Sequence, residues 1–239
     1  QIEYKVQFDP NGGTWDDGTR AAKVEYTTDG SIASVKLENP TKEGYEFTGW
    51  WYGDTRWGFN TKVVEDINLT AGWNPIEYTV TVDANGGDLP AGQGDSLKVK
   101  YGETVTVQSP TMTGATFMGW ADGNGNTWVS GETPITGDVA IKAVWNTNEY
   151  TVIYMDGDTE IHREQVAYGS TITYAQPDAK EGFTFEGWYQ DNGFVTPWDM
   201  SQGVGGNVTL YAKYTAVTYT VEFNANSGSF INDPTISLN

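Results

Sequence analysis

Apolar and polar residues alternate in short stretches along this chain, and one such stretch occurs four times. It begins with a tyrosine, and its first, third and fifth residues are apolar or aromatic, at 4–8, 78–82, 150–154 and 219–223. A period of two is typical of a β-strand with one buried face. Residues that accept a positive φ at little cost follow, such as Asn11-Gly12-Gly13. The pattern predicts a strand that runs into a tight turn.

A second signature, Gly-x-x-Phe-x-Gly-Trp, occurs three times, at 44–50, 114–120 and 182–188. If Phe47 faces the core, strict alternation turns Trp50 outward. A β-bulge at the second glycine, Gly49 in the first case, turns the indole inward again. The sequence therefore predicts a bulge and a buried tryptophan in all three signatures.

Two further alternating segments accompany each signature. A closing segment lies at 67–73, 139–145 and 208–214, and an intermediate one at 22–26, 97–101 and 164–168. In the intermediate segments, Tyr26 is expected to correspond to Tyr101 and Tyr168. Glycine and proline leave space for at most one helical turn around 41–44. At least four strands per copy are expected, so the predicted class is mainly β.

The repetition predicts the domain organisation. The signatures recur about every 70 residues, a length at which a domain buries roughly 60% of its unfolded surface. We expect three copies, each with its own core, at 1–74, 75–146 and 147–215. Residues 216–239 resemble the start of a fourth copy, either cut from a continuing array or pairing with a neighbouring sheet edge. Short connections between copies predict an elongated array of these modules.

Composition excludes several classes of function. The chain has no cysteine, one histidine, and 32 acidic against 13 basic residues, for a net charge of -19. Disulfides, thiol chemistry and most zinc sites are therefore excluded. The negative charge repels phosphate backbones, so nucleic acid is not an expected partner. No apolar run is long enough to insert into a membrane. Because the chain opens with Gln1, we expect a processed or excised piece.

Candidate chemistry is sparse. Paired carboxylates such as Asp16-Asp17 are interpreted as surface charge, because glycosidase chemistry needs two carboxylates facing each other across a cleft. His162 lies among charged residues and is interpreted as a surface histidine. The segment 122–126 begins like a calcium loop, but Thr127 replaces the turn glycine and Thr133 the bidentate glutamate. We expect no catalytic residue, no metal and no cofactor.

The ten tryptophans raise the alternative of a carbohydrate-binding module. Eight of them occupy positions that recur between copies and are expected to pack in cores: 50, 57, 73, 120, 128, 145, 188 and 198. Trp15 and Trp51 are left over, both in the first copy. Because indole faces stack on sugar rings, an exposed Trp15 and Trp51 would form the candidate ligand-binding surface of this alternative.

The ordered signatures resemble the Listeria-Bacteroides repeat, the B-repeat type of internalins. The resemblance rests on the Tyr-Thr-Val strand, the Tyr-Gly step and the Gly-x-x-Phe-x-Gly-Trp signature, and it covers nearly the whole chain. The first copy departs from it with Tyr26-Thr27 in place of Tyr-Gly, and the second with Ala115 in place of an aromatic residue.

The resemblance implies small β-grasp-like modules of bacterial cell-surface or secreted proteins, working outside the cell. They serve as stalks or spacers, in some cases with a part in adhesion, and they have no catalytic residues. Expected partners are a host or environmental protein or a glycan, and the expected form is a monomeric rod.

Overall fold

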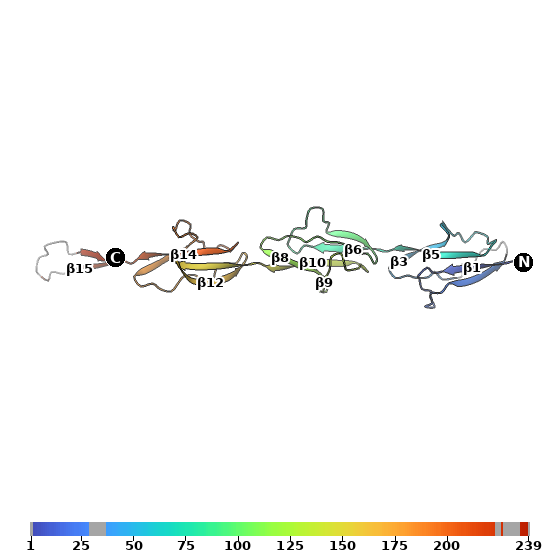
Figure 1. The fold of residues 1–239 in the computed structure, drawn as a ribbon, viewed down its shortest axis with the longest axis horizontal. Helices are drawn as coiled ribbons and strands as arrows, with labels where there is room; N and C mark the ends of the chain where they lie inside the picture. The colour runs from blue at the N-terminus through green and yellow to red at the C-terminus, as the bar shows by residue number, and fades with distance from the viewer. Residues whose placement is uncertain (1, 29–36, 223–225, 227–234, 239) are drawn as a thin grey trace. The chain divides into compact units, whose positions relative to one another are not determined.

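The structure is a computed structural model that describes residues 2–28, 37–222, 226 and 235–238. Within these residues the regular secondary structure is entirely β, with no helix. Three mixed sheets follow one another along the chain, and a short two-stranded sheet comes after them. Figure 1 shows their strands in order from blue to red. The predicted fold class, mainly β with small modules in tandem, is confirmed.

The first sheet has the strand order β2-β1-β5-β3-β4. Strands β1 and β5 pair in parallel, whereas β1 with β2 and β3 with β5 pair antiparallel. The strands of this sheet are β1 (Glu3–Asp9), β2 (Lys23–Thr28), β3 (Tyr45–Tyr52), β4 (Thr55–Arg56) and β5 (Ile67–Pro75).

The second sheet repeats this order as β7-β6-β10-β8-β9, and the third repeats its first four strands as β12-β11-β14-β13. The parallel pair recurs as β6 with β10 and as β11 with β14. The second sheet comprises β6 (Glu77–Asp83), β7 (Ser96–Lys100), β8 (Ala115–Asp122), β9 (Thr127–Trp128) and β10 (Val139–Thr147). The third comprises β11 (Glu149–Asp156), β12 (Thr159–Ala167), β13 (Phe183–Tyr189) and β14 (Val208–Ala216).

The last sheet consists of β15 (Tyr219–Glu222) and β16 (Thr235–Leu238), which pair antiparallel with each other. Among the described strands, β15 therefore has its partner in β16 and not in the edge of a neighbouring copy's sheet. For these described strands, the alternative in which the fourth copy's first strand pairs with a neighbouring sheet edge is wrong.

Residue contacts group the chain into two compact units: 1–110 with 118–144, and 111–117 with 145–239. The copy boundaries at 74, 146 and 215 stay a prediction.

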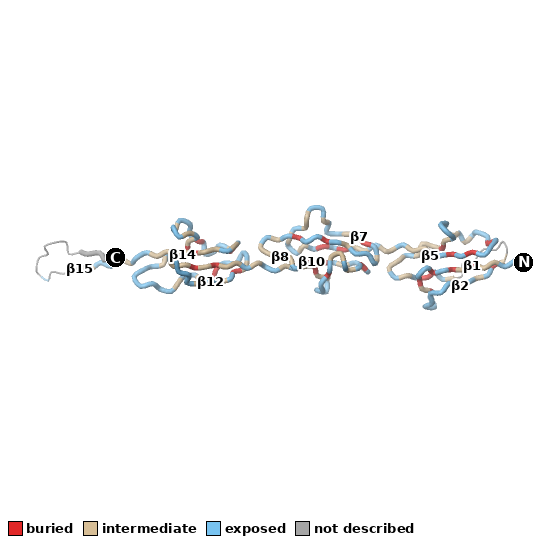
Figure 2. Tube along the Cα trace, in the orientation of Figure 1, coloured by how far each residue is buried: buried red, intermediate tan, exposed pale blue. Residues whose placement is uncertain are grey.

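The first copy has a core on one face of its sheet. Val6 and Phe8 of β1 and Leu69 of β5 are almost completely buried there. Trp15 and Val63, which lie in connecting segments, belong to the same cluster and close it from above the sheet. A cluster with the same plan in the third copy contains Val152, Tyr154, Val166, Ile172, Trp188, Trp198, Val204, Leu210 and Ala212. Figure 2 shows the buried residues in red, concentrated on the inner strands.

The predicted bulges are present in the first and third copies. The pairing register shifts between Phe47 and Gly49 in β3, and the same shift occurs in β13. The second glycines of the three signatures have φ of 123°, 138° and 142° at Gly49, Gly119 and Gly187. Such angles favour glycine, which explains the residue type. The tryptophans that follow are 3%, 4% and 2% exposed, so their predicted burial is confirmed.

The turn after the first strand is also built as expected. Asn11 and Asn85 have φ of 48° and 52°. Their side-chain amides donate to the carbonyl oxygens of Ala71 and Ala143 on the closing strands, at 3.0 and 2.9 Å. The asparagine therefore has two roles: it accepts a positive φ, and its side chain attaches the turn to the closing strand.

One expected correspondence is wrong. In the pairing registers, Tyr4 faces Thr27, whereas Tyr78 faces Val99 and Tyr150 faces Val166. Thr27 therefore occupies the position of the two valines, and Tyr26 does not correspond to Tyr101 or Tyr168. The local resemblance of 22–26 to the other two segments is offset from their register by three residues.

Candidate functional surface

Trp15 lies in the core and not on the surface. Its side chain is 2% exposed and stacks on Trp50 with 5.7 Å between ring centroids. Its indole N–H donates to the carbonyl oxygen of Ala21 at 2.8 Å. The expected exposure of Trp15 is therefore wrong. A connecting segment can bury a large ring as fully as a strand can when it folds over the open face of a sheet.

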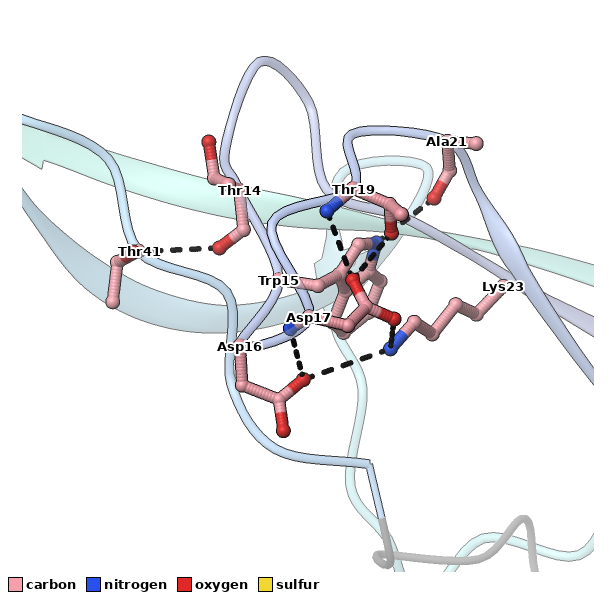
Figure 3. Close-up of polar contacts among 8 residues, drawn as sticks. All are labelled: Thr14, Trp15, Asp16, Asp17, Thr19, Ala21, Lys23 and Thr41. Carbon is pink, nitrogen blue, oxygen red and sulfur yellow. Dashed lines mark hydrogen bonds and ion pairs between the residues drawn. The ribbon is translucent and has the colours of Figure 1, made fainter.

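The carboxylates next to Trp15 organise its loop (Figure 3). Asp17 accepts hydrogen bonds from the backbone and hydroxyl of Thr19 at 2.9 and 2.6 Å, and its other oxygen lies 2.9 Å from Lys23 Nζ. Lys23 Nζ also lies 4.8 Å from the centroid of the Trp15 ring. The Asp16-Asp17 pair thus fixes the loop over the core, a role that the interpretation as plain surface charge missed.

These contacts also determine the ionisation of Asp17 and Lys23. The bonds from Thr19, and next the contact with Lys23, hold the pKa of Asp17 far below its ordinary value. The same ion pair raises the pKa of Lys23. An aspartate with so low a pKa stays ionised at neutral pH, which makes it a poor general acid or base.

Trp51 occupies a different place. It is half-buried on β3 and lines a shallow pocket of about 420 Å³ together with Asn11, Thr48, Trp73 and Asn74. Its ring lies against Gly72 of β5. The indole nitrogen is buried and has no hydrogen-bond acceptor among the described residues.

The structure does not bring Trp15 and Trp51 together. Successive residues of a strand point to opposite faces of the sheet. Trp15 stacks on Trp50, so Trp51, the next residue, faces the other side. Sugar binding at Trp15 and Trp51 stays a prediction, and Trp51 lines the pocket described above.

The loop at 122–126 is a plain turn. One carboxylate oxygen of Asp122 accepts the backbone N–H groups of Asn124 and Asn126, both at 2.9 Å. These bonds, that from Asn126 first, lower the pKa of Asp122. The carboxylate is therefore engaged within its own turn. Over the described part of the chain, no group of three or more histidine, cysteine or acidic residues is placed to hold a metal ion.

The third copy contains a polar cluster that the sequence analysis missed. The Tyr154 hydroxyl and the Thr173 hydroxyl both donate to the Glu164 carboxylate. His162 is half-buried and stacks on Tyr174 with 4.1 Å between ring centroids, a contact that its interpretation as an ordinary surface histidine did not include. The first copy has Phe8 at the strand position of Tyr154, with an apolar ring in place of the hydroxyl.

The cluster predicts an acid sensitivity of the third copy. Burial opposes ionisation of Glu164, but hydrogen bonds from Thr173 and Tyr154 outweigh it and lower its pKa. A group whose pKa is lower in the folded state contributes stability above its unfolded pKa and loses that contribution as pH falls through its folded pKa. We expect β11 and β12 to lose stability as the pH falls below the ordinary pKa of a glutamate, about 4.3.

Glu164→Gln tests this. At pH 7 the substitution should cost the third copy about 1–2 kcal/mol, because a charge-assisted acceptor is lost. It should also flatten the pH dependence of amide hydrogen exchange in β11 and β12. Glu186→Gln, at an exposed position on β13, is the control. If both variants keep the acid sensitivity of the unchanged chain, Glu164 is not its source.

The fold and the recurring positions together define the class: an all-β protein of tandem repeats whose shared residues build one small core after another. The chain belongs to the Listeria-Bacteroides repeat domain family, which it matches over residues 4–72, 78–144 and 150–213. This family is found in bacterial surface proteins such as internalins and is typically non-catalytic.

Similar proteins agree with this assignment. Two proteins of Evansella cellulosilytica, named "Putative Gly-rich membrane protein" and "Putative membrane protein", are each 34% identical to the chain, over 96% and 93% of it. Internalin H of Listeria monocytogenes is 31% identical over 58% of the chain. The chain spans only 26%, 33% and 25% of the lengths of these three relatives. Within the described residues, no helix has the length and apolar character needed to cross a membrane.

Proposed function

We propose that this chain is a non-catalytic spacer segment of a bacterial cell-surface or secreted protein, working outside the cell. One observation supports the proposal most strongly. The polar contacts that occur at the same place in every copy join strands of that copy, and so they stabilise the fold. A side-chain oxygen just before each closing strand accepts a backbone N–H from the first strand. Asp66 accepts from Lys5 at 2.8 Å, Asp138 from Thr79 at 2.7 Å and Asn207 from Thr151 at 2.9 Å.

The family and the charge support the same function. Surface proteins such as internalins contain this repeat, and a spacer is a role in which the number of copies matters more than the chemistry of any one. The net charge of -19 disfavours self-association, as a monomeric spacer requires. Binding of a host protein, an environmental protein or a glycan belongs, in this proposal, to surface residues that differ between copies.

The experiment is to display the chain on a bacterial surface between a cell-wall anchor and an N-terminal epitope. Removal of residues 78–149 joins Glu77 to Tyr150 and deletes one copy in register. This deletion should lower the epitope by a fixed height above the cell. Removal of another copy should lower it by the same height again. The conservative variant Glu186→Gln is the full-length control.

Two outcomes would count against the spacer. An epitope height that does not change with copy number would contradict it directly. If one copy alone bound a glycan or host protein saturably, with the affinity of the complete chain, an adhesive module would be favoured instead. If Trp51→Ala abolished glycan binding of this kind, the carbohydrate-binding alternative would replace the spacer.

A further inference from the structure

Each Gly-x-x-Phe-x-Gly-Trp signature begins with a glycine in the left-handed region. Gly44, Gly114 and Gly182 have φ of 75°, 75° and 78°. Each of their carbonyl oxygens accepts a backbone N–H from the connection that follows the closing strand. The donors are Ile76 at 2.9 Å, Asn148 at 2.9 Å and Val217 at 2.8 Å. The three glycines therefore share both backbone angle and hydrogen bond.

A tyrosine from the next copy covers the first two glycines. A Cβ on Gly44 would collide with the Tyr101 ring, and a Cβ on Gly114 with the Tyr168 ring. The tyrosine N–H also binds the connection residue: Tyr101 donates to the Ile76 carbonyl oxygen at 2.9 Å, and Tyr168 donates to that of Asn148 at 2.8 Å. We call each set of glycine, connection residue and tyrosine a clasp.

Each clasp lies within one compact unit. Gly44, Ile76 and Tyr101 belong to the unit that contains residues 1–110, and Gly114, Asn148 and Tyr168 belong to the other unit.

The residue after each clasp tyrosine is attached to the tyrosine's own copy. Gly102 and Gly169 have φ of 79° and 78°. Their N–H groups donate to the carbonyl oxygens of Ile135 and Val204, both at 2.8 Å. Ile135 and Val204 are 2% and 0% exposed. The Tyr-Gly step thus joins the core of one copy to the glycine of the copy before it.

The third glycine has the same backbone but no ring of a described residue over it. A Cβ on Gly182 would meet no described atom within 4 Å. The next residue, Phe183, is 45% exposed. The equivalent residue of the first copy, Tyr45, is half-buried and meets the edge of the Tyr101 ring at 5.9 Å.

The strand registers explain the difference. Tyr219 faces Leu238, as Tyr78 faces Val99 and Tyr150 faces Val166. The clasp tyrosines come two residues after these valines. In the fourth copy, the position of the clasp tyrosine is two residues after Leu238. That position directly follows Asn239 and lies outside this sequence.

We propose that the Gly182 and Phe183 surface is a docking site for the Tyr-Gly step of a further Listeria-Bacteroides repeat that continues the chain, as Gly44 and Gly114 are for Tyr101 and Tyr168. The signature glycine is thus required for contact with the next copy, in addition to its role in its own turn. The proposal rests on the family and the clasp geometry and does not depend on the spacer function.

Three alanine substitutions in the complete chain separate these two roles. Gly44→Ala, Gly114→Ala and Gly182→Ala impose the same backbone strain, but only the first two place a methyl group against a tyrosine ring. Gly182→Ala should speed amide hydrogen exchange in β13 by about 5–30-fold. Gly44→Ala and Gly114→Ala should speed exchange in β3 and β8 by about a further tenfold. Equal effects at all three sites would overturn the proposal.

A double substitution checks that the ring is the cause. In a chain that carries Tyr168→Ala, Gly114→Ala should speed exchange no more than Gly182→Ala does in the unchanged chain. Tyr26→Ala is the control, because Tyr26 is a strand tyrosine that is 65% exposed and belongs to neither clasp. An undiminished effect of Gly114→Ala in the Tyr168→Ala chain would contradict the clasp.

The docking site itself is tested by extension. A segment copied from residues 101–149 is appended after Asn239, which places a Tyr-Gly step in the register that Leu238 defines. Exchange of the Val217 amide should slow at least about tenfold, and Gly182→Ala should become as disruptive as Gly114→Ala. The same extension with alanine in place of its leading tyrosine should produce neither change. If both extensions behave alike, Gly182 is not a docking site.

Discussion

Trp188→Ala will selectively unfold the third copy and leave the first intact. Trp188 is 2% exposed, and its ring lies edge-on to those of Tyr154 and Phe185, with centroids 4.7 and 5.2 Å apart. Its indole N–H donates to the Ala175 carbonyl oxygen at 3.1 Å. Truncation of such a residue leaves a cavity and an unpaired carbonyl, and we expect a loss of about 3–5 kcal/mol.

Amide hydrogen exchange resolved by peptide measures this effect, because it reports the copies separately. Exchange in β11, β13 and β14 should approach that of an unfolded chain, while β1 and β5 keep their protection. Val195→Ala is the control in the same copy. Val195 is 80% exposed, so its truncation should change stability by no more than about 0.5 kcal/mol. Loss of protection in β1 and β5 as well would show that the copies do not fold separately.

Gly13→Ala is the second large effect, and it is steric. A Cβ at this position would lie against the Trp73 indole, 2.9 Å from the Pro10 carbonyl oxygen and 3.2 Å from Pro40 Cβ. The indole cannot withdraw freely, because its N–H donates to the same Pro10 oxygen at 3.1 Å. Overpacking of this kind should cost the first copy about 2–3 kcal/mol.

Gly137→Ala is the matched control, because a Cβ there meets no described atom within 4 Å and neither glycine has a positive φ. Gly137→Ala should leave the exchange of β1 and β5 unchanged, whereas Gly13→Ala should accelerate it. Equal stability of the two variants would mean that the Trp73 contact is looser than the structure indicates.

Regular parts of the fold could be predicted from the sequence because they obey a period. Alternation in 67–73 and 208–214 identified the closing strands, and the glycines at 49 and 187 identified the points at which alternation fails. These features are local: backbone preference and side-chain direction decide them within a few residues.

The errors arose where the outcome depends on contacts distant in sequence. Trp15 was a candidate for a binding ring because no other copy has a tryptophan there, yet its loop folds over the sheet and buries the ring. The correspondence of Tyr26 followed residue similarity, whereas the strand register aligns Thr27 with Val99 and Val166 and leaves Tyr26 out of line with the two tyrosines. The Glu164 cluster consists of residues from β11, β12 and a following loop. No short sequence motif indicates such a cluster.

The clasps also depend on contacts between residues that are distant in sequence. The sequence contains both parts, the glycine that opens each signature and the Tyr-Gly step, and each has a reason within its own copy. Only the structure shows that the ring of one copy covers the glycine of the copy before it. Repetition in the sequence shows which residues recur at the same spacing in each copy. It does not show which of these residues contact each other across two successive copies.

Because each repeat encloses its own core, we expect the chain to be a series of separately folded copies. Force-extension measurement on single molecules of the complete chain, held by its two ends, can decide whether it is. We expect three separate unfolding events, each releasing about 20 nm of chain, with one event lost in Trp188→Ala. A single event that releases all three copies together would contradict it.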